Sequence, residues 1–272
     1  MSANAGHRAP KEKRPRLDRL LFERGLAGTR EKARAMIMAG TVEVNGVRVD
    51  KPGWRVPDQA MVSLKAVRPP YVSRGGQKLE AALDHFEVDV HSLHLLDVGA
   101  STGGFTDCLL KRGAGEIIAI DVGYGQLDWT LRQDPRVTVL EKTNIRYVKP
   151  EQLTNLAHGA VIDVSFISLR LVVPPVSHLL LDDAFIIALI KPQFEVGKGQ
   201  VGKGGVVRDS RLHKEILETL HRFFQDAGWR VKGHIPSPLL GPKGNREFLV
   251  YMTRGGTGNW KLVVDPVFSG ET

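Results

Sequence analysis

LLDVGASTGGF, residues 95–105, decides the fold of this 272-residue chain. An apolar run ends at Val98, and a turn with three glycines, Gly99, Gly103 and Gly104, leads into a helical pattern. Glycine permits tight turns and lets the backbone pass close to a ligand. A strand, a glycine-rich turn and a helix in this order are typical of nucleotide sites in doubly wound sheets. The stretch therefore predicts an α/β domain with a ligand at the carboxyl end of this strand.

Strand and helix patterns alternate on both sides of this stretch, which predicts a Rossmann-like sheet with helices on both faces. The expected strands are residues 93–98, 116–121, 137–141, 160–164 and 185–190, followed by a closing pair at 230–235 and 247–252. The expected helices are residues 106–112, 174–181 and 211–227.

The ligand at the glycine turn could be a dinucleotide or S-adenosylmethionine, because both lie across the carboxyl ends of parallel strands. Asp121 ends the next strand, where a carboxylate can bind ribose hydroxyls in either case. Two details favour the methyl donor. Asp97 lies two residues before Gly99, from where its carboxylate can reach the donor's ammonium group. The glycine pattern is also G-x-x-x-G-G, which differs from the dinucleotide pattern G-x-G-x-x-G.

The first quarter of the chain carries all of the net positive charge. Residues 1–70 hold 15 lysines and arginines against 7 acidic residues, whereas residues 71–272 hold 23 of each. We expect a flexible basic arm over residues 1–15. A compact α+β unit follows over residues 16–66, where two helical patterns precede a hairpin around Asn45-Gly46. A basic module beside a neutral one predicts contact with a polyanion, either RNA or DNA.

This order of two helices and a hairpin resembles the S4 RNA-binding domain. The resemblance is carried by Arg16-Leu17-Asp18, Leu20, Thr29-Arg30, Ala33, Ile37, Gly40 and the hairpin 42–49. In that family the second helix and the turn after it present basic side chains to structured RNA. The resemblance therefore implies RNA contacts by Arg16, Arg19, Arg30, Lys32, Arg34 and Arg48. Phosphate contacts of this kind supply affinity with little sequence choice.

Two lysines and two carboxylates form a candidate catalytic set near the strand ends. Asp163 and Lys191 each end an apolar strand, where a charge would otherwise be costly. Glu247 opens the last strand, and Lys78 lies just before the first strand of the large domain. A ribose hydroxyl is a poor nucleophile at neutral pH and needs a positioned base. A lysine close to another cation can serve as that base while acids hold its geometry.

The order lysine, aspartate, lysine, glutamate on this fold resembles the tetrad of the FtsJ-like ribose 2′-O-methyltransferases. Four segments together are similar to the TlyA (hemolysin A) family: SRGGQKL (73–79), DVGASTGGF (97–105), IDVSFISL (162–169) and KPQFEVGK (191–198). With the S4-type unit the resemblance covers residues 16–253. It implies catalytic roles for Lys78, Asp163, Lys191 and Glu247, with Lys191 as the preferred activator of the 2′-hydroxyl.

The same resemblance implies S-adenosylmethionine as cofactor and cytidines of ribosomal RNA as substrate, in the RNA or in ribosomal subunits. The donor contacts that it implies, besides Asp97, are Gly99, Ser101, Gly103, Gly104, Phe105, Asp121 and Asn144. We expect the methyltransferase domain over residues 74–254, a short stiff linker over 67–73 and a loose tail over 255–272.

Composition excludes several other classes of protein. The single cysteine, Cys108, rules out an internal disulfide and is expected in a helix core. The nine histidines show no metal-ligand spacing, so no metal is predicted. Apolar runs stay well below the roughly 20 residues that a membrane helix needs, and the polar, basic start lacks a signal-peptide core. These features predict a cytoplasmic protein. Tyr124 and Trp129, near the donor turn, could stack on adenine or pack, and packing is favoured.

Three alternatives stay open. The chain could be a base N-methyltransferase that uses residues 163–166 (DVSF) as its catalytic tetrapeptide, although such enzymes need no second lysine. It could be a lytic membrane protein, as the hemolysin name suggests, which would need a long apolar segment or an exposed amphipathic helix. It could also be an RNA-binding or ribosome-assembly factor without catalysis.

Overall fold

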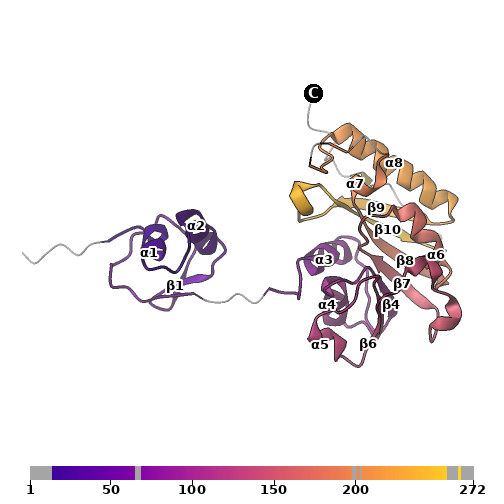
Figure 1. Ribbon diagram of the computed structural model, residues 1–272, viewed down its shortest axis with the longest axis horizontal. Coiled ribbons are helices and arrows are strands. Elements are labelled where there is room, and N and C mark those ends of the chain that lie inside the picture. Colours follow the sequence, from indigo (N-terminus) through magenta and orange to yellow (C-terminus); the bar gives the residue numbers. More distant parts are fainter. Residues whose placement is uncertain (1–13, 65–68, 198–200, 203, 256–262, 265–272) are drawn as a thin grey trace, which may run out of the picture. The chain divides into compact units, whose positions relative to one another are not determined.

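The computed structural model describes residues 14–64, 69–197, 201–202, 204–255 and 263–264 (Figure 1). The chain divides into two units between Arg68 and Pro69. The predicted arm, apart from residues 14 and 15, and most of the predicted tail 255–272 lie outside the described residues.

The first unit has the predicted order of two helices and a hairpin. Its elements are α1 (Leu17–Glu23), α2 (Arg30–Met38), β1 (Val42–Val44), β2 (Val47–Val49) and β3 (Val62–Leu64). Thr29 caps α2, because its side chain accepts a hydrogen bond from the backbone N–H of Lys32. Asn45 and Gly46 both have positive φ, as a tight turn between right-twisted strands requires. The strands pair antiparallel in the order β2-β1-β3.

The second unit contains an eight-stranded sheet in the order β11-β9-β10-β8-β7-β4-β5-β6. Its strands are β4 (His94–Val98), β5 (Glu116–Ile120), β6 (Val137–Leu140), β7 (Ala157–Ile162), β8 (Leu180–Ile190), β9 (Arg230–Pro236), β10 (Phe248–Thr253) and β11 (Val263–Val264). The run from β6 to β8 is parallel, and β10 is antiparallel to both of its neighbours. The chain leaves β4 toward β5 on one side and later returns to β7 on the other, so a ligand crevice is expected at the carboxyl end of β4.

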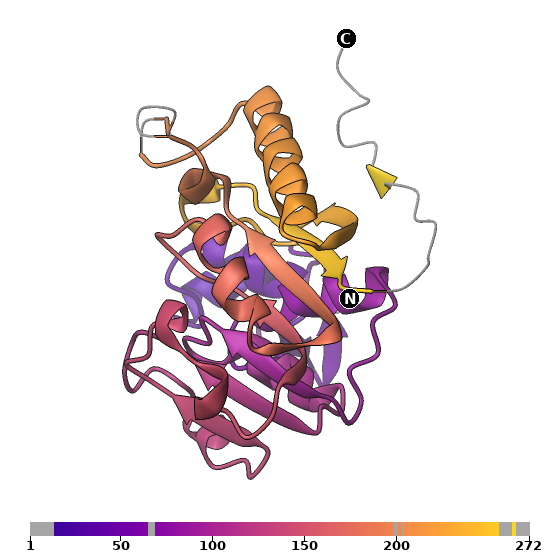
Figure 2. The ribbon, with the colours of Figure 1, turned by 90° about the vertical axis from the view of Figure 1, so that its right-hand side faces the viewer.

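Helices cover both faces of this sheet, as predicted. They are α3 (Gly75–His85), α4 (Gly104–Lys111), α5 (Trp129–Arg132), α6 (Val173–Ser177), α7 (Pro192–Glu195) and α8 (Ser210–Asp226). Short 3-10 turns lie at Ile145–Tyr147 (η1), Pro150–Gln152 (η2), Leu169–Leu171 (η3) and Pro242–Gly244 (η4). Figure 1 shows α3 and α4 on one face, and Figure 2, turned by 90°, has α6 and α8 in front of the strands.

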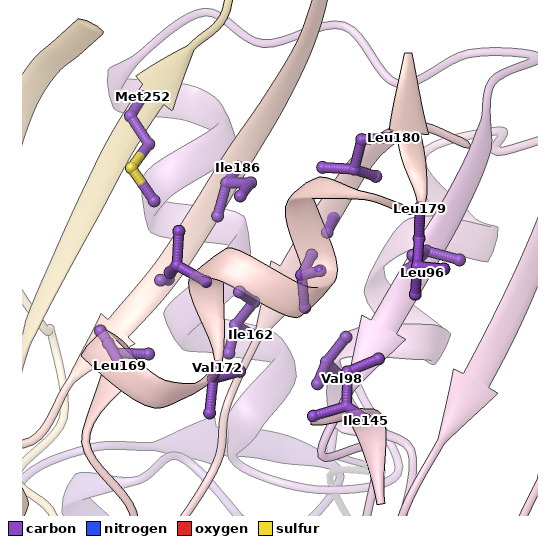
Figure 3. Close-up of a cluster of buried hydrophobic side chains, with 14 of the residues drawn as sticks. Leu96, Val98, Ile145, Ile162, Leu169, Val172, Leu179, Leu180, Ile186 and Met252 are labelled. Atoms are coloured by element: carbon purple, nitrogen blue, oxygen red, sulfur yellow. The ribbon is translucent and has the colours of Figure 1, made fainter. Parts of the chain in front are cut away.

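Alternate residues of each central strand pack into two separate apolar cores, one on each face of the sheet. Leu95, Ile117 and Val161 join the core under α3 and α4. Their neighbours Leu96 and Ile118 join the core under α6 and α8, part of which is drawn in Figure 3. Because both faces of the parallel strands are buried, the central parts of these strands are continuously apolar. Charged side chains are therefore concentrated near the strand ends, where the candidate residues lie.

Two expected boundaries differ in the structure. The predicted helix 174–181 ends early, because Leu180 and Leu181 already belong to β8. The predicted linker 67–73 overlaps the second unit. The Tyr71 ring is buried in the core under α3 and α4, and its hydroxyl donates to Glu80 on α3 over 2.7 Å. The Val72 backbone N–H also donates to Asp107 on α4.

Candidate active site

The glycine turn lies at the carboxyl end of β4, against the end of β7. Gly99 has φ +86°, and a Cβ there would stand 2.6 Å from the carbonyl oxygen of Asp163. Only glycine therefore lets these two strand ends approach so closely. The turn leads directly into α4, whose first residues Gly104 and Phe105 line a cavity together with Gly99.

A cavity of about 440 Å³ opens on one side of this turn, and it is lined by four of the residues predicted to bind the donor. These are Gly99, Ser101, Asp121 and Asn144. The Asp121 carboxylate accepts hydrogen bonds from the backbone N–H groups of Ser101, over 2.8 Å, and Gly123, over 2.6 Å. Each carboxylate oxygen keeps acceptor capacity beyond these bonds. Apolar walls are supplied by Val122, Ile145 and Ile167, among others.

Two predicted donor residues do not line either of the two large cavities at the turn. The Asp97 carboxyl group is fully buried, and the Thr106 hydroxyl on α4 donates to one of its oxygens. Gly103 has φ +94°, and a Cβ there would collide with the Leu127 and Leu131 side chains. Both residues therefore pack behind the turn in this structure, and their contact with the donor stays a prediction.

Burial raises the pKa of Asp97 to about 7, and the Thr106 hydrogen bond opposes this effect only in part. Because the folded-state pKa lies above the ordinary value of 3.8, the folded protein holds a proton that the unfolded chain has lost. Stability should therefore fall as the pH rises from about 4 through 7, by roughly 4 kcal/mol in total. Asp97→Asn should remove this slope, which denaturant titrations between about pH 4 and 8 can measure. Parallel curves for the two proteins would contradict the expectation.

The four predicted catalytic residues come together at a second cavity of about 460 Å³, on the other side of the turn. They form two ion pairs. The Lys191 Nζ atom lies 2.7 Å from Asp163 Oδ1, and the Lys78 Nζ atom lies 2.6 Å from Glu247 Oε2. Lys78, Asp163 and Lys191 line the cavity, whereas Glu247 lies behind Lys78 with its side chain fully buried. Each lysine thus contacts a carboxylate. We expected from the sequence that the catalytic lysine would instead lie close to another cation.

Gly241 covers the Glu247 carboxylate. A Cβ at Gly241 would overlap with Glu247 Oε1, and that oxygen has no hydrogen-bond partner among the described residues. Gly241 directly precedes the η4 turn, and together with Lys243 of that turn it lines the cavity. The part of the cavity lining at Gly241 therefore lies directly against the Glu247 carboxylate.

The structure adds Ser165 and Phe166, which the predicted set of four catalytic residues did not include. The Lys191 Nζ atom donates to the Ser165 hydroxyl over 2.9 Å, and Ser165 lines both cavities. Phe166 is 90% exposed and has φ +64°, a conformation that is costly for a bulky residue. Its ring centre lies 5.0 Å from the ring centre of Phe194. Both Ser165 and Phe166 belong to the DVSF stretch. Their closeness to Asp163 in the sequence was the feature that could have indicated a role at the site.

Two expectations about side chains near the donor turn have opposite outcomes. Cys108 is fully buried in the core of α4, as predicted, and burial raises the pKa of its thiol to about 12. Tyr124 and Trp129 were expected to pack, and this was wrong, because they are 71% and 68% exposed. Tyr124 instead contacts the Lys142 ammonium group, which lies 4.4 Å from its ring centre.

The six basic residues expected to contact RNA are all exposed on the first unit, but they differ in their contacts. Arg16 and Arg30 both bind the buried carboxylate of Asp18, at 3.1 and 3.2 Å, and hold its pKa below the usual range against the opposing effect of burial. Arg19 pairs with Glu23 at 2.6 Å, and the Arg48 guanidinium group covers Gly40. For Lys32 and Arg34, on α2, the structure records no ion pair with another described side chain.

Two further features bear on the alternatives. Within the described ranges, the structure contains no group of three histidine, cysteine or acidic side chains arranged to hold a metal ion. In the same ranges, none of the helices is both long enough and apolar enough to cross a membrane.

Comparison with known proteins identifies both units. The FtsJ-like methyltransferase family matches residues 71–254, and the S4 domain matches residues 15–62. The chain is 46% identical over 241 residues to the 16S/23S rRNA (cytidine-2′-O)-methyltransferase TlyA of Mycobacterium tuberculosis (strain ATCC 25618 / H37Rv), covering 88% of this chain and 90% of that protein.

Two more relatives span most of the chain. Hemolysin A of Brachyspira hyodysenteriae is 40% identical, covering 87% of this chain and 98% of its own length. A solved structure of a protein from Streptococcus thermophilus is 44% identical, covers 94% of this chain and 93% of its own, and superposes with a TM-score of 0.69. The chain belongs to the FtsJ-like methyltransferase family, and it joins the methyltransferase domain to an N-terminal S4 domain.

Proposed function

We propose that this protein uses S-adenosylmethionine to methylate ribose 2′-hydroxyls, at cytidines of ribosomal RNA. The observation that carries the proposal is the pair of lysine–carboxylate contacts at one cavity, directly beside the glycine turn. The rRNA (cytidine-2′-O)-methyltransferase activity named for the M. tuberculosis relative supports the choice of ribosomal RNA and cytidine. The S4 domain lies within the first 70 residues, which hold all of the net positive charge, and this supports an RNA substrate.

The cavity beside Asp121 fits the donor. The Asp121 carboxylate faces this cavity and is fixed by two backbone N–H groups, so it can accept hydrogen bonds from ribose hydroxyls. Val122, Ile145 and Ile167 offer apolar surface for a flat base, and Asn144 adds a polar group to the lining. When bound, S-adenosylmethionine supplies a methyl group on a positively charged sulfur atom.

Lys191 is placed to accept the proton of the target hydroxyl. As a neutral amine its Nζ atom can accept that proton while the oxygen forms its new bond to carbon. The Asp163 carboxylate and the Ser165 hydroxyl hold Nζ from two directions, and the lysine side chain lines the cavity. Lys78 lies on the same cavity and is held by Glu247, so it contributes positive charge near the reacting oxygen.

Alkaline hydrolysis tests the site of methylation. A 2′-O-methyl group removes the nucleophile that cleaves the adjacent phosphodiester, so the modified position should appear as a gap in the hydrolysis ladder of ribosomal RNA treated with the protein and the donor. The base N-methyltransferase alternative predicts methyl incorporation with an uninterrupted ladder. The contact between Lys191 Nζ and Asp163 supports the ribose reaction, because a base methyltransferase would need that acid for its own target.

Phe166 should hold the target nucleotide. Its ring is exposed, its backbone has positive φ, and it lines the donor-side cavity together with Asp163 and Ser165. Stacking of a base on an aromatic ring contributes about 1–3 kcal/mol. Phe166→Ala should therefore lower kcat/KM for RNA by about 10- to 100-fold, and Phe166→Trp should retain most of it. Equal kcat/KM for Phe166→Ala and wild type would exclude this role.

A further inference from the structure

Two chain segments run side by side at the active site and touch at three successive points. The first segment, residues 163–169, follows β7, and the second, residues 191–195, follows β8. Lys191 contacts Asp163 and Ser165 at one end. The Phe166 and Phe194 rings meet in the middle, with centres 5.0 Å apart. Glu195 contacts Ser168 and Leu169 at the other end.

Glu195 fixes the far end of this arrangement from a buried position. Its two carboxylate oxygens accept from the Ser168 hydroxyl at 2.6 Å and from the Leu169 backbone N–H at 2.8 Å. Burial raises the pKa of Glu195, and these two hydrogen bonds oppose that effect. Burying a carboxyl group costs free energy of folding. A carboxyl group that is buried here and bound twice to one loop therefore suggests a role in holding that loop. Leu169 itself is buried in the apolar core, where Figure 3 shows it, so the loop is tied down beside a rigid support.

Ser165 fixes the near end through the amine itself. A lysine side chain is a flexible four-carbon stem, so one contact to Asp163 leaves the Nζ atom free to swing about that contact. The second contact, to the Ser165 hydroxyl, removes this freedom. A hydroxyl is also suited to a group that changes protonation state, because it can either accept from an N–H or donate to a lone pair.

We propose that Ser165 and Glu195 are positioning residues for Lys191, and that they act together by holding segment 163–169 against segment 191–195. This inference rests on the proposed ribose methylation, since it assigns Lys191 the role of activating the 2′-hydroxyl. The Ser165 hydroxyl sets the direction of the amine, and the Glu195 carboxylate keeps the Ser165-bearing loop in place. Neither residue needs to touch the donor for this role.

Steady-state kinetics on the full-length protein test the proposal, with Ser165→Ala, Ser165→Thr, Glu195→Ala and Glu195→Gln. Ser165→Ala and Glu195→Ala should each lower kcat about tenfold, while the KM for ribosomal RNA and the Kd for S-adenosylmethionine stay within about twofold. Ser165→Thr and Glu195→Gln should restore most of kcat, because both keep hydrogen-bonding groups in place. The matched controls are Ser210→Ala and Glu218→Ala, both at exposed positions on α8.

The thermal midpoint of each variant separates positioning from folding. If Glu195→Ala lowers the midpoint strongly, Ser168→Ala replaces it. That change removes the Ser168 bond to Glu195 and the Ser168 cap on the Arg170 N–H, but it leaves the Glu195 bond to Leu169. Wild-type kcat in Ser165→Ala, or equal losses in Ser165→Ala and Ser165→Thr, would overturn the inference while leaving ribose methylation intact. A wild-type protein that produces no gap in the hydrolysis ladder would instead overturn the proposed function, and this inference with it.

Discussion

Lys191→Ala should abolish measurable methyl transfer, with kcat lowered about 10²–10⁴-fold, the range that a positioned general base contributes. The protein should remain folded and should still bind RNA. The Asp163 side chain that loses its partner is 23% exposed, so water can solvate the carboxylate after the change. Single-turnover methylation of ribosomal RNA measures the rate, and filter binding measures the affinity.

Lys191→Arg distinguishes a proton acceptor from a simple positive charge. Arginine keeps the charge and can still pair with Asp163, but it cannot lose its proton in a protein. Lys191→Arg should therefore be as inactive as Lys191→Ala. Lys214→Ala, at an exposed lysine on α8, serves as the matched control and should have the wild-type rate. Substantial activity in Lys191→Arg would assign the residue an electrostatic role and remove it as the base.

The strands and part of the candidate site could be predicted from sequence at positions where only a few residue types are compatible with the local structure. Asp163 and Lys191 directly follow buried apolar runs, and a charge in such a place is rare unless it lies at a functional edge. Gly99 was identifiable because the close turn between a buried strand and a helix favours glycine. Parallel strands also end at one edge of the sheet, which brings Val98 beside Ile162 although the two are far apart in the chain.

Other features could not be predicted because they depend on side-chain direction. Asp97 follows the strand alternation onto the face under α4, so its carboxyl group turns toward Thr106 and away from the cavities. Periodicity alone does not show whether a polar residue near a turn faces ligand or core. Ser165 and Glu195 are ordinary polar residues in sequence, and their roles arise only when two distant loops are adjacent. The Asp18 contacts of Arg16 and Arg30 likewise depend on where the side chains point.

Lys78→Met should destabilise the protein by about 3–5 kcal/mol, the usual cost of removing one partner from a buried ion pair. Glu247 would then be a buried carboxylate without its lysine, since its side chain is fully inaccessible and its second oxygen already lacks a partner among the described residues. Guanidinium denaturation measures the loss. Lys214→Met, at a lysine that is 61% exposed, is the control and should change stability by less than about 0.5 kcal/mol.

Combining Lys78→Met with Glu247→Gln separates the structural from the chemical role of this pair. Glutamine has nearly the shape of glutamate but carries no charge, so the double variant no longer buries an unpaired ion and should regain most of the lost stability. Methyl transfer should not return, because the cavity still lacks the Lys78 ammonium group beside the reacting oxygen. A double variant that is both stable and active would show that the Lys78–Glu247 pair only supports the fold, and the chemistry would then rest on Lys191 and Asp163 alone.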